Sequence, residues 1–306
     1  MPEAAFHDIG VAVIAPSGYA PDLAAYERGI AKLKTLGFRV HDYYAPEGKV
    51  ERFGGSDAAR LLQLQDATNN PDVQLVLAVR GGYGISRLLP QLDFQSMAAS
   101  GKLFVGHSDF TPIHLGLLGA GATSFAGPFI LPDFGAESPS SFTMAQFIHC
   151  LTSPEHSVSG QAENNPNVDA SGVLWGGNLS MIAHLLGTPY QPRCENGILF
   201  LEDIAEHPYR IERMLLQLLH AGILQKQQAI LLGDFSGYRL SDYDNGYDFD
   251  TMLAFLRGRL DIPVLSGLPF GHIPDKATLA VGAQARLQGN GGQWQLAMRN
   301  YRYINP

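Results

Sequence analysis

Apolar segments that alternate with amphipathic segments constrain the fold of this chain more than any other feature. In the first half, apolar runs at 11–15, 73–79 and 103–105 are separated by segments of helical periodicity, of which residues 22–36 are the clearest. Strands that are apolar on both faces need cover on both faces, and intervening helices provide it. The sequence therefore predicts an α/β fold with a mostly parallel sheet.

A polar stretch rich in turn-forming residues divides the chain near its middle. Residues 152–172 contain several Asn, Ser, Gly and Pro residues, and we interpret them as a linker between domains at 1–151 and 173–306. The second domain shows a more mixed pattern. A helix is expected to begin at Pro208, and Asn290-Gly291-Gly292 is typical of a hairpin turn.

Composition excludes several functional classes. The 306 residues include 29 acidic and 21 basic ones, a net charge of −8, and the absence of any basic run argues against nucleic acid as a partner. No apolar run is long enough to span a membrane, and no secretion signal is visible. Cys150 and Cys194 lie outside any metal-binding motif, and neither HExxH nor a P-loop occurs. We expect a cytoplasmic protein without disulfides, metal or cofactor.

The segment from Lys102 to Thr111 has the pattern of a strand, a sharp turn and a helix. Apolar residues lead into Gly106, Ser108 follows two residues later, and an amphipathic segment begins at once. A serine on such a turn can act as a nucleophile, because the N–H groups at the start of the helix can stabilise an oxyanion. The alternative is that Ser108 only caps the helix.

The glycine-rich turn Arg80-Gly81-Gly82-Tyr83-Gly84 follows the apolar strand at 73–79. Glycines let the backbone approach a ligand closely, so this turn could bind an anion or contribute to an oxyanion hole. It could also be a simple tight turn. Ligands of open α/β sheets bind beyond the carboxyl ends of the strands, and both this turn and Ser108 are expected at that edge.

Two residues in the second half are candidates for acid and base. Glu202 directly follows the apolar strand 198–201, where a carboxylate can orient a histidine, although it could equally be a surface acid. Its neighbours Asp203 and Glu206 are competing candidates. His272 lies in a loop rich in Gly and Pro, and catalytic side chains are often presented from such loops.

Five segments together resemble the LD-carboxypeptidase family of serine peptidases, and they occur in the family's order along nearly the whole chain. They are Arg80-Gly-Gly-Tyr-Gly84, Gly106-His-Ser-Asp109, Trp175-Gly-Gly-Asn-Leu179 with Gly187-Thr-Pro189, Leu199-Phe-Leu-Glu-Asp203 and Phe270-Gly-His272. The resemblance implies a flavodoxin- or amidotransferase-like N-terminal domain, a smaller C-terminal α/β domain and a homodimer. It also implies a site in the cleft between the domains.

The same resemblance assigns catalytic roles. Ser108 is the expected nucleophile, Glu202 the orienting acid and His272 the general base, while the backbone N–H groups of Asp109 and Gly82 form the expected oxyanion hole. The implied reaction removes the terminal D-alanine from the tetrapeptide of a muropeptide, as part of peptidoglycan recycling.

Substrate contacts are less specific in the sequence. An exopeptidase must bind a free carboxylate, for which Arg80, Arg87 or Lys276 could supply the cation, and Tyr83 is a further candidate contact. One alternative function is hydrolysis of peptidyl-nucleotide antibiotics, in which Trp175 could stack on the base, although a tryptophan in an apolar run is more often core. Another is a non-catalytic two-domain protein that binds a small ligand.

Overall fold

The computed structural model describes residues 6–191 and 193–305. Contacts between Cα atoms divide the chain into two compact units. Among the described residues, unit 1 comprises 6–154, 274–281 and 302–305, and unit 2 comprises 155–273 and 282–301. Each unit is built on its own β-sheet. The predicted α/β class, with a mostly parallel N-terminal sheet and a smaller C-terminal α/β unit, is confirmed.

The sheet of unit 1 has the strand order β11-β5-β4-β3-β1-β2. Its strands are β1 (Gly10–Ile14), β2 (Arg39–Asp42), β3 (Leu75–Ala78), β4 (Leu103–Gly106), β5 (Ser124–Ala126) and β11 (Leu279–Val281). All neighbours are parallel except β11, which is antiparallel to β5. Strands β1, β3, β4 and β5 are buried along their whole length, as expected for a sheet covered on both faces.

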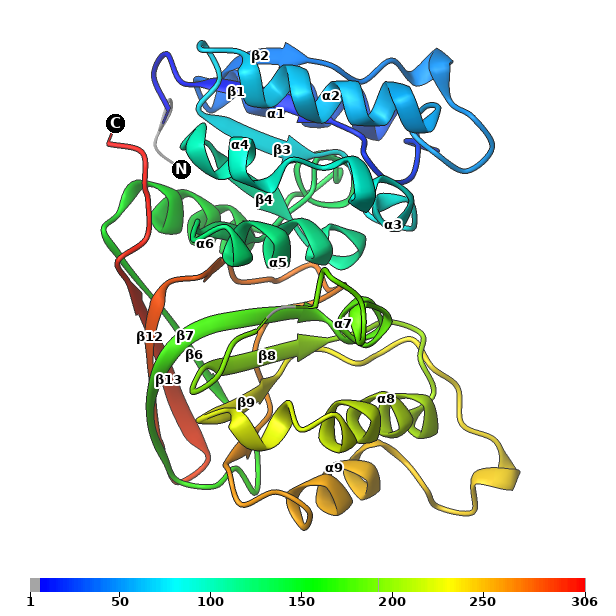
Figure 1. Cartoon of the computed structure of the whole chain (residues 1–306), viewed down its shortest axis with the longest axis vertical. Helices are drawn as coiled ribbons and strands as arrows, with labels where there is room; N and C mark the ends of the chain where they lie inside the picture. The colour runs from blue at the N-terminus through cyan, green and yellow to red at the C-terminus, as the bar shows by residue number, and fades with distance from the viewer. Residues whose placement is uncertain (1–5, 192, 306) are drawn as a thin grey trace. The chain divides into compact units, whose positions relative to one another are not determined.

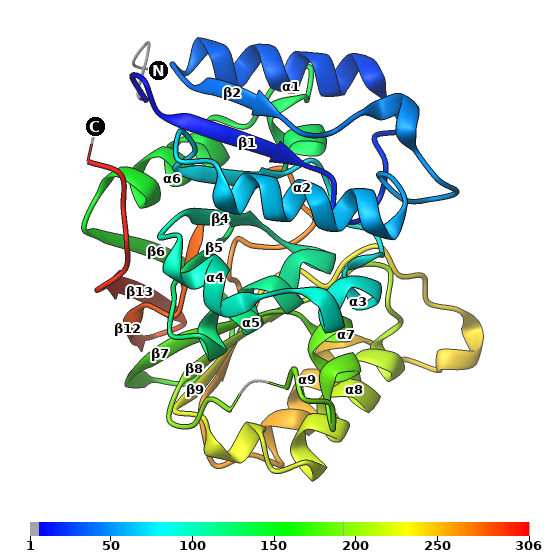
Figure 2. The same ribbon diagram turned by 45° about the horizontal axis from the view of Figure 1, so that its top comes forward.

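Helices cover both faces of this sheet. They are α1 (Leu23–Thr35), α2 (Asp57–Asn69), α3 (Ile85–Leu88), α4 (Phe94–Ala99), α5 (Thr111–Gly119) and α6 (Ser141–Thr152). Right-handed connections place α1 and α2 on opposite faces, because β1 leads outward to β2 whereas β2 leads back to β3 (Figure 2). Asp22 and Ser56 cap α1 and α2 with their side chains, as local sequence predicts.

The sheet of unit 2 has the order β10-β9-β8-β7-β12-β13-β6. Its strands are β6 (Glu155–Gln161), β7 (Val168–Asn178), β8 (Ile198–Glu202), β9 (Ala229–Leu232), β10 (Val264–Leu265), β12 (Gln284–Asn290) and β13 (Gln293–Arg299). The long strand β7 joins the two halves of this sheet (Figure 1). It pairs antiparallel with β12 through residues 168–173 and parallel with β8 through residues 174–178.

Three helices accompany the parallel half of this sheet: α7 (Leu179–Leu185), α8 (Pro208–His220) and α9 (Phe249–Arg257). Helix α8 packs against both α7 and α9. Pro208 opens α8, as predicted, and the expected hairpin turn at 290–292 joins β12 to β13. Within the described residues, none of the helices has the length and apolar character needed to cross a membrane.

The predicted linker at 152–172 contains regular structure. Residues 155–161 form β6, and residues 168–172 begin β7. The segment is polar because these strands have one exposed side: Val158 is buried, whereas Ser157 and Ser159 are exposed. The expected second domain is also interrupted, because residues 274–281 return to unit 1 and add β11 to its sheet.

Candidate active site

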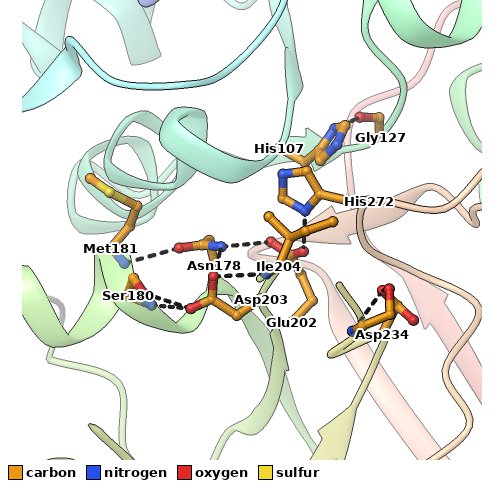
Figure 3. Close-up of polar contacts among 11 residues, drawn as sticks. His107, Gly127, Asn178, Ser180, Met181, Glu202, Asp203, Ile204, Asp234 and His272 are labelled. Carbon is orange, nitrogen blue, oxygen red and sulfur yellow. Dashed lines mark hydrogen bonds and ion pairs between the residues drawn. The ribbon is translucent and has the colours of Figure 1, made fainter. Parts of the chain in front are cut away.

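Glu202 and His272, both in unit 2, form a close pair. Glu202 is the last residue of β8 and is fully buried, and its Oε2 accepts a hydrogen bond from Nδ1 of His272 over 2.8 Å. An ionised carboxylate can only accept, so Nδ1 carries the proton and the acceptor role of the ring falls to Nε2. This is the arrangement in which a carboxylate orients a general base. Figure 3 shows the pair.

The sheet register explains why these residues meet. Asn178 ends β7 directly beside Glu202, so the parallel strands finish at one edge. The loop that bears His272 is attached to the same edge, because the N–H of Asp234 donates to the carbonyl of Phe270 over 2.8 Å. Gly271 has φ 137°, and a Cβ there would lie 3.2 Å from Oε2 of Glu202. Glycine therefore permits the close approach of the histidine loop to the acid.

Buried polar side chains surround the second oxygen of Glu202. The Nδ2 of Asn178 donates to Oε1 of Glu202 over 3.1 Å and to Oδ1 of Asp203 over 2.9 Å. The other oxygen of Asp203 accepts from the backbone N–H and the hydroxyl of Ser180 (Figure 3). Asp203, a competing candidate acid in the sequence, is thus paired with Asn178 and the start of α7, whereas Glu202 contacts the histidine. Sequence reasoning did not single out Asn178 as a site residue.

Ser108 lies on a strained turn in unit 1. It follows β4 and opens the 3₁₀ turn Ser108–Phe110, which runs into α5, and its φ is 57°. Non-glycine residues rarely adopt this conformation, and such strain is concentrated at functional sites. A Cβ on Gly81 would lie 3.0 Å from Oγ of Ser108, so the glycine-rich turn packs directly on this serine. Residues of both turns predicted at the sheet edge are therefore in contact.

The side chain of Asp109 holds these turns together. It is buried, and its Oδ2 accepts hydrogen bonds from the hydroxyl of Ser17 over 2.6 Å and from the N–H of Ile85 over 3.0 Å. Ile85 directly follows the glycine-rich turn, in which Gly82 has φ 109°. The carboxylate thus fixes the backbone that carries the two predicted oxyanion donors, the N–H groups of Asp109 and Gly82.

Two histidines near Ser108 are occupied with structural contacts. Nδ1 of His107 lies 2.8 Å from the carbonyl of Gly127, and its ring stacks on Phe129 (Figure 3 shows the first contact). His114 is fully buried and bridges the carbonyl of Gly106 and the hydroxyl of Ser124. Burial lowers the pKa of His114 from 6.5 to about 4, so the ring is neutral at physiological pH. His114 therefore supports the end of β4 without titrating near neutrality.

Two of the predicted substrate contacts, Trp175 and Lys276, are buried in the structure. Trp175 is 1% exposed and faces the core of unit 2, where its indole N–H donates to Gln227 over 2.8 Å. Its place in the apolar run of β7 explains this burial, which disfavours stacking on a ligand. Lys276 is 3% exposed and forms a buried ion pair with Asp133. Its charge is therefore already compensated inside unit 1 and is not presented to a substrate carboxylate.

The remaining candidate contacts have different surroundings. Arg80 is partly exposed, and its Nη1 lies 3.4 Å from the carbonyl of Tyr19. Tyr83 is 41% exposed and lies near the ring of Phe53. Arg87 is paired with Asp57 over 2.9 Å. Arg80 and Tyr83 stay predictions. Arg80 is the better candidate cation because, among the described residues, its guanidinium forms no ion pair with an acidic side chain.

A metal site has no support in the residues that the structure describes, since no group of three or more His, Cys, Asp or Glu side chains there could hold an ion. The acidic segment at 242–244, which resembles a calcium loop only superficially, forms a 3₁₀ turn. Asp244 in this turn lies 3.1 Å from His207, and His207 caps α8, as its position before Pro208 predicts.

Both halves of the chain match domains of one protein family. The LD-carboxypeptidase N-terminal domain matches residues 11–127, which include the Ser108 turn. The LD-carboxypeptidase C-terminal domain matches residues 171–287, which include Glu202 and His272. The chain therefore belongs to the LD-carboxypeptidase family, and the protein is a carboxypeptidase of the serine type.

Individual relatives agree with this membership. A crystal structure of muramoyltetrapeptide carboxypeptidase from Oxalobacter formigenes is 54% identical, has a TM-score of 0.92 and covers 96% of this chain and 99% of its own. The murein tetrapeptide carboxypeptidase of Pseudomonas aeruginosa is 29% identical over 93% of this chain and 94% of its own length. The microcin C7 self-immunity protein MccF of Escherichia coli is 27% identical, with 84% and 83% covered.

Proposed function

We propose that this protein is an L,D-carboxypeptidase that removes the terminal D-alanine from murein tetrapeptide through Ser108, His272 and Glu202. The observation that carries the proposal is the 2.8 Å contact between His272 and the buried Glu202, which supplies an oriented general base. The strained Ser108 turn supports the choice of nucleophile. The names of the relatives from Oxalobacter formigenes and Pseudomonas aeruginosa support the choice of substrate.

In the proposed acylation step, Oγ of Ser108 attacks the carbonyl carbon of the residue that precedes the terminal D-alanine, while Nε2 of His272 takes the hydroxyl proton. The N–H groups of Asp109 and Gly82 stabilise the oxyanion. The tetrahedral intermediate then collapses, the C–N bond breaks, and His272 returns the proton to the amine of the leaving D-alanine. Glu202 stabilises the imidazolium throughout.

Deacylation repeats these roles with water as the nucleophile. His272 takes a proton from a water molecule, which attacks the acyl-enzyme carbonyl, and the ester bond to Ser108 breaks. The proton passes to Oγ of Ser108, and the product is a tripeptide with a new carboxylate. We propose Arg80 as the cation that binds the carboxylate of the terminal D-alanine, because an exopeptidase must distinguish a free chain end.

Incubation of the purified protein with disaccharide tetrapeptide, followed by mass spectrometry, tests the function. We expect loss of one alanine residue and no other change. Ser108→Ala should retain substrate binding and lose turnover, while Glu206→Gln, which alters the competing acid that pairs with Arg210, should behave as wild type. An intact tetrapeptide after prolonged incubation with wild-type protein would refute the proposal.

Similarity to MccF keeps hydrolysis of peptidyl-nucleotides as a second candidate function. The burial of Trp175 disfavours it, because the aromatic side chain that the sequence offered for base stacking lies in the core. Parallel assays with a muropeptide and an aminoacyl sulfamoyl nucleoside distinguish the two. We also propose a homodimer and a cytoplasmic location. Sedimentation velocity and cell fractionation test these two properties separately from the reaction.

A further inference from the structure

We propose that Asn178 is a positioning residue for catalysis, which acts on His272 by holding the carboxylate of Glu202. The inference rests on the proposed function, because it assigns a role within the same triad. Its basis is the juxtaposition of an asparagine at the end of β7 with two consecutive carboxylates at the end of β8 (Figure 3).

Both oxygens of Glu202 are hydrogen-bonded to side chains. The residue is fully buried, so each oxygen needs a hydrogen-bond donor from the protein. Oε2 receives the Nδ1 proton of His272 over 2.8 Å, and Oε1 receives a proton of Asn178 over 3.1 Å. Donors on both oxygens define the plane of the carboxylate and therefore the direction in which it holds the imidazole.

Asn178 contacts two neighbouring carboxylates. Glu202 and Asp203 are adjacent in sequence, and both are buried, so their carboxylates repel each other at short range. The amide nitrogen of Asn178 carries two protons and directs one to each carboxylate, over 3.1 Å and 2.9 Å. The amide of Asn178 thus donates a hydrogen bond to each of the two carboxylates at once. A side chain with a single polar proton cannot donate to both.

Asn178 is itself held in place by the start of α7. Its Oδ1 accepts from the N–H of Met181 over 3.1 Å and caps α7, which fixes the amide with its nitrogen toward the carboxylates. Asp203 is anchored independently, because Ser180 donates to its Oδ2 and the N–H of Ile204 donates to its Oδ1. The amide of Asn178 is therefore fixed by the start of α7 and by the carboxylate of Asp203. Its hydrogen bond to Glu202 then positions the carboxylate of Glu202.

Asn178→Ser and Asn178→Asp test the role, because both residues can still cap α7 but neither supplies an amide N–H. We expect kcat on the disaccharide tetrapeptide to fall about 10- to 100-fold, as for small misplacements of a catalytic group. KM should change less than about threefold, because Asn178 acts through Glu202 rather than on the substrate. Asp248→Ala, which removes the cap of α9 in the same unit, is the control and should leave kcat unchanged.

A second readout does not depend on any substrate. Nuclear magnetic resonance of protein with isotope-labelled histidine follows the Nδ1 proton that His272 shares with Glu202, and His272→Gln assigns its signal. We expect exchange of this proton with water to accelerate at least about tenfold in both Asn178 variants. The Asp248→Ala control should show the wild-type rate, although we expect thermal unfolding to show that it is less stable.

The outcomes are distinguishable. If wild-type protein leaves the tetrapeptide intact, the proposed function fails, and the exchange measurement still decides the role of Asn178. Unchanged exchange in both folded variants would overturn the inference whatever the activity. Faster exchange together with wild-type kcat would also overturn it, because Glu202 would then not need Asn178 to orient the base. Faster exchange with reduced kcat supports it.

Discussion

The role proposed for Glu202 depends on the hydrogen bonds of both its carboxylate oxygens. Both of its oxygens are bonded inside the protein, to His272 on one side and Asn178 on the other. An acid with such partners cannot be replaced by an amide of the same shape, because an amide presents a donor where one of these contacts needs an acceptor.

For Glu202→Gln we therefore expect kcat/KM on the tetrapeptide to fall by up to about 10⁴-fold, the loss seen when the orienting acid of a triad becomes an amide. The neutral residue no longer stabilises the imidazolium or fixes its tautomer. Steady-state kinetics measure the effect. Activity within tenfold of wild type would show that Glu202 is not the orienting acid.

Ser108 combines strain with its proposed role as nucleophile, so its substitution separates activity from stability. Ser108→Gly and Ser108→Ala should both lower turnover by about 10⁶-fold if the triad acts as a unit. The glycine variant should be about 1 kcal/mol more stable than the alanine variant, because φ 57° is unstrained only for glycine. Calorimetry of both variants tests this difference, and equal stabilities would argue against stored strain.

One neutral histidine, His114, links helix α5 to strands β4 and β5. His114 on α5 bonds to the end of β4 and to Ser124, the first residue of β5. Full burial favours the uncharged ring, because an imidazolium at this place would lose its hydration.

This preference for the uncharged ring predicts an acid-sensitive fold. The unfolded chain binds a proton at His114 near pH 6.5, whereas the folded protein does so only near pH 4, so stability is full above pH 6.5 and is lost as pH falls toward 4. The contribution is about 3 kcal/mol. Urea unfolding between pH 7 and pH 4 should show a smaller loss in His114→Gln than in wild type, and identical losses would contradict the assignment.

Local sequence patterns predict some elements of this fold and not others. Strands β1, β3 and β4 have continuous apolar runs, and α1 has helical periodicity. Asp22 and Ser56 cap helices through contacts within three residues. In β6 and the first part of β7, only the residues on one side of the strand are buried. The segment 152–172 therefore has the composition of a loop. Pairing with β13 and β12, far away in sequence, makes it a sheet.

At the scale of the whole molecule, the segment that follows His272 is built into unit 1. Residues 274–281 contribute β11, and Lys276 forms a buried ion pair with Asp133. The pair matters to the stability of the fold chiefly because removal of one partner would leave the other charge buried and unpaired. The attraction between the partners contributes less.

Asp133→Ala should therefore destabilise the protein by about 3–5 kcal/mol, because it leaves the Lys276 ammonium buried without a counter-charge. The double variant Asp133→Leu with Lys276→Met should recover most of this loss. Urea denaturation of the three proteins measures both effects. A single variant as stable as wild type would show that Lys276 is not confined by this contact.

A chelator gives a further test on the whole enzyme. The proposed reaction uses an imidazole base and backbone donors, so EDTA followed by gel filtration should leave tetrapeptide hydrolysis at its original rate. Loss of activity that returns when a divalent metal ion is added would contradict the serine mechanism and require a different catalytic group.

By itself, the sequence determined the alternation of strands and helices in the first half of the chain, the turn that presents Ser108, and the identity of Glu202 and His272 as candidates. These follow from apolar periodicity, from turn-forming glycines and from short motifs, all of which are local. Only the tertiary structure decided that Glu202 rather than Asp203 contacts His272, that Asn178 holds Glu202, and that Trp175 and Lys276 are buried. Those outcomes depend on which distant segments pair in a sheet, and no local pattern encodes the register.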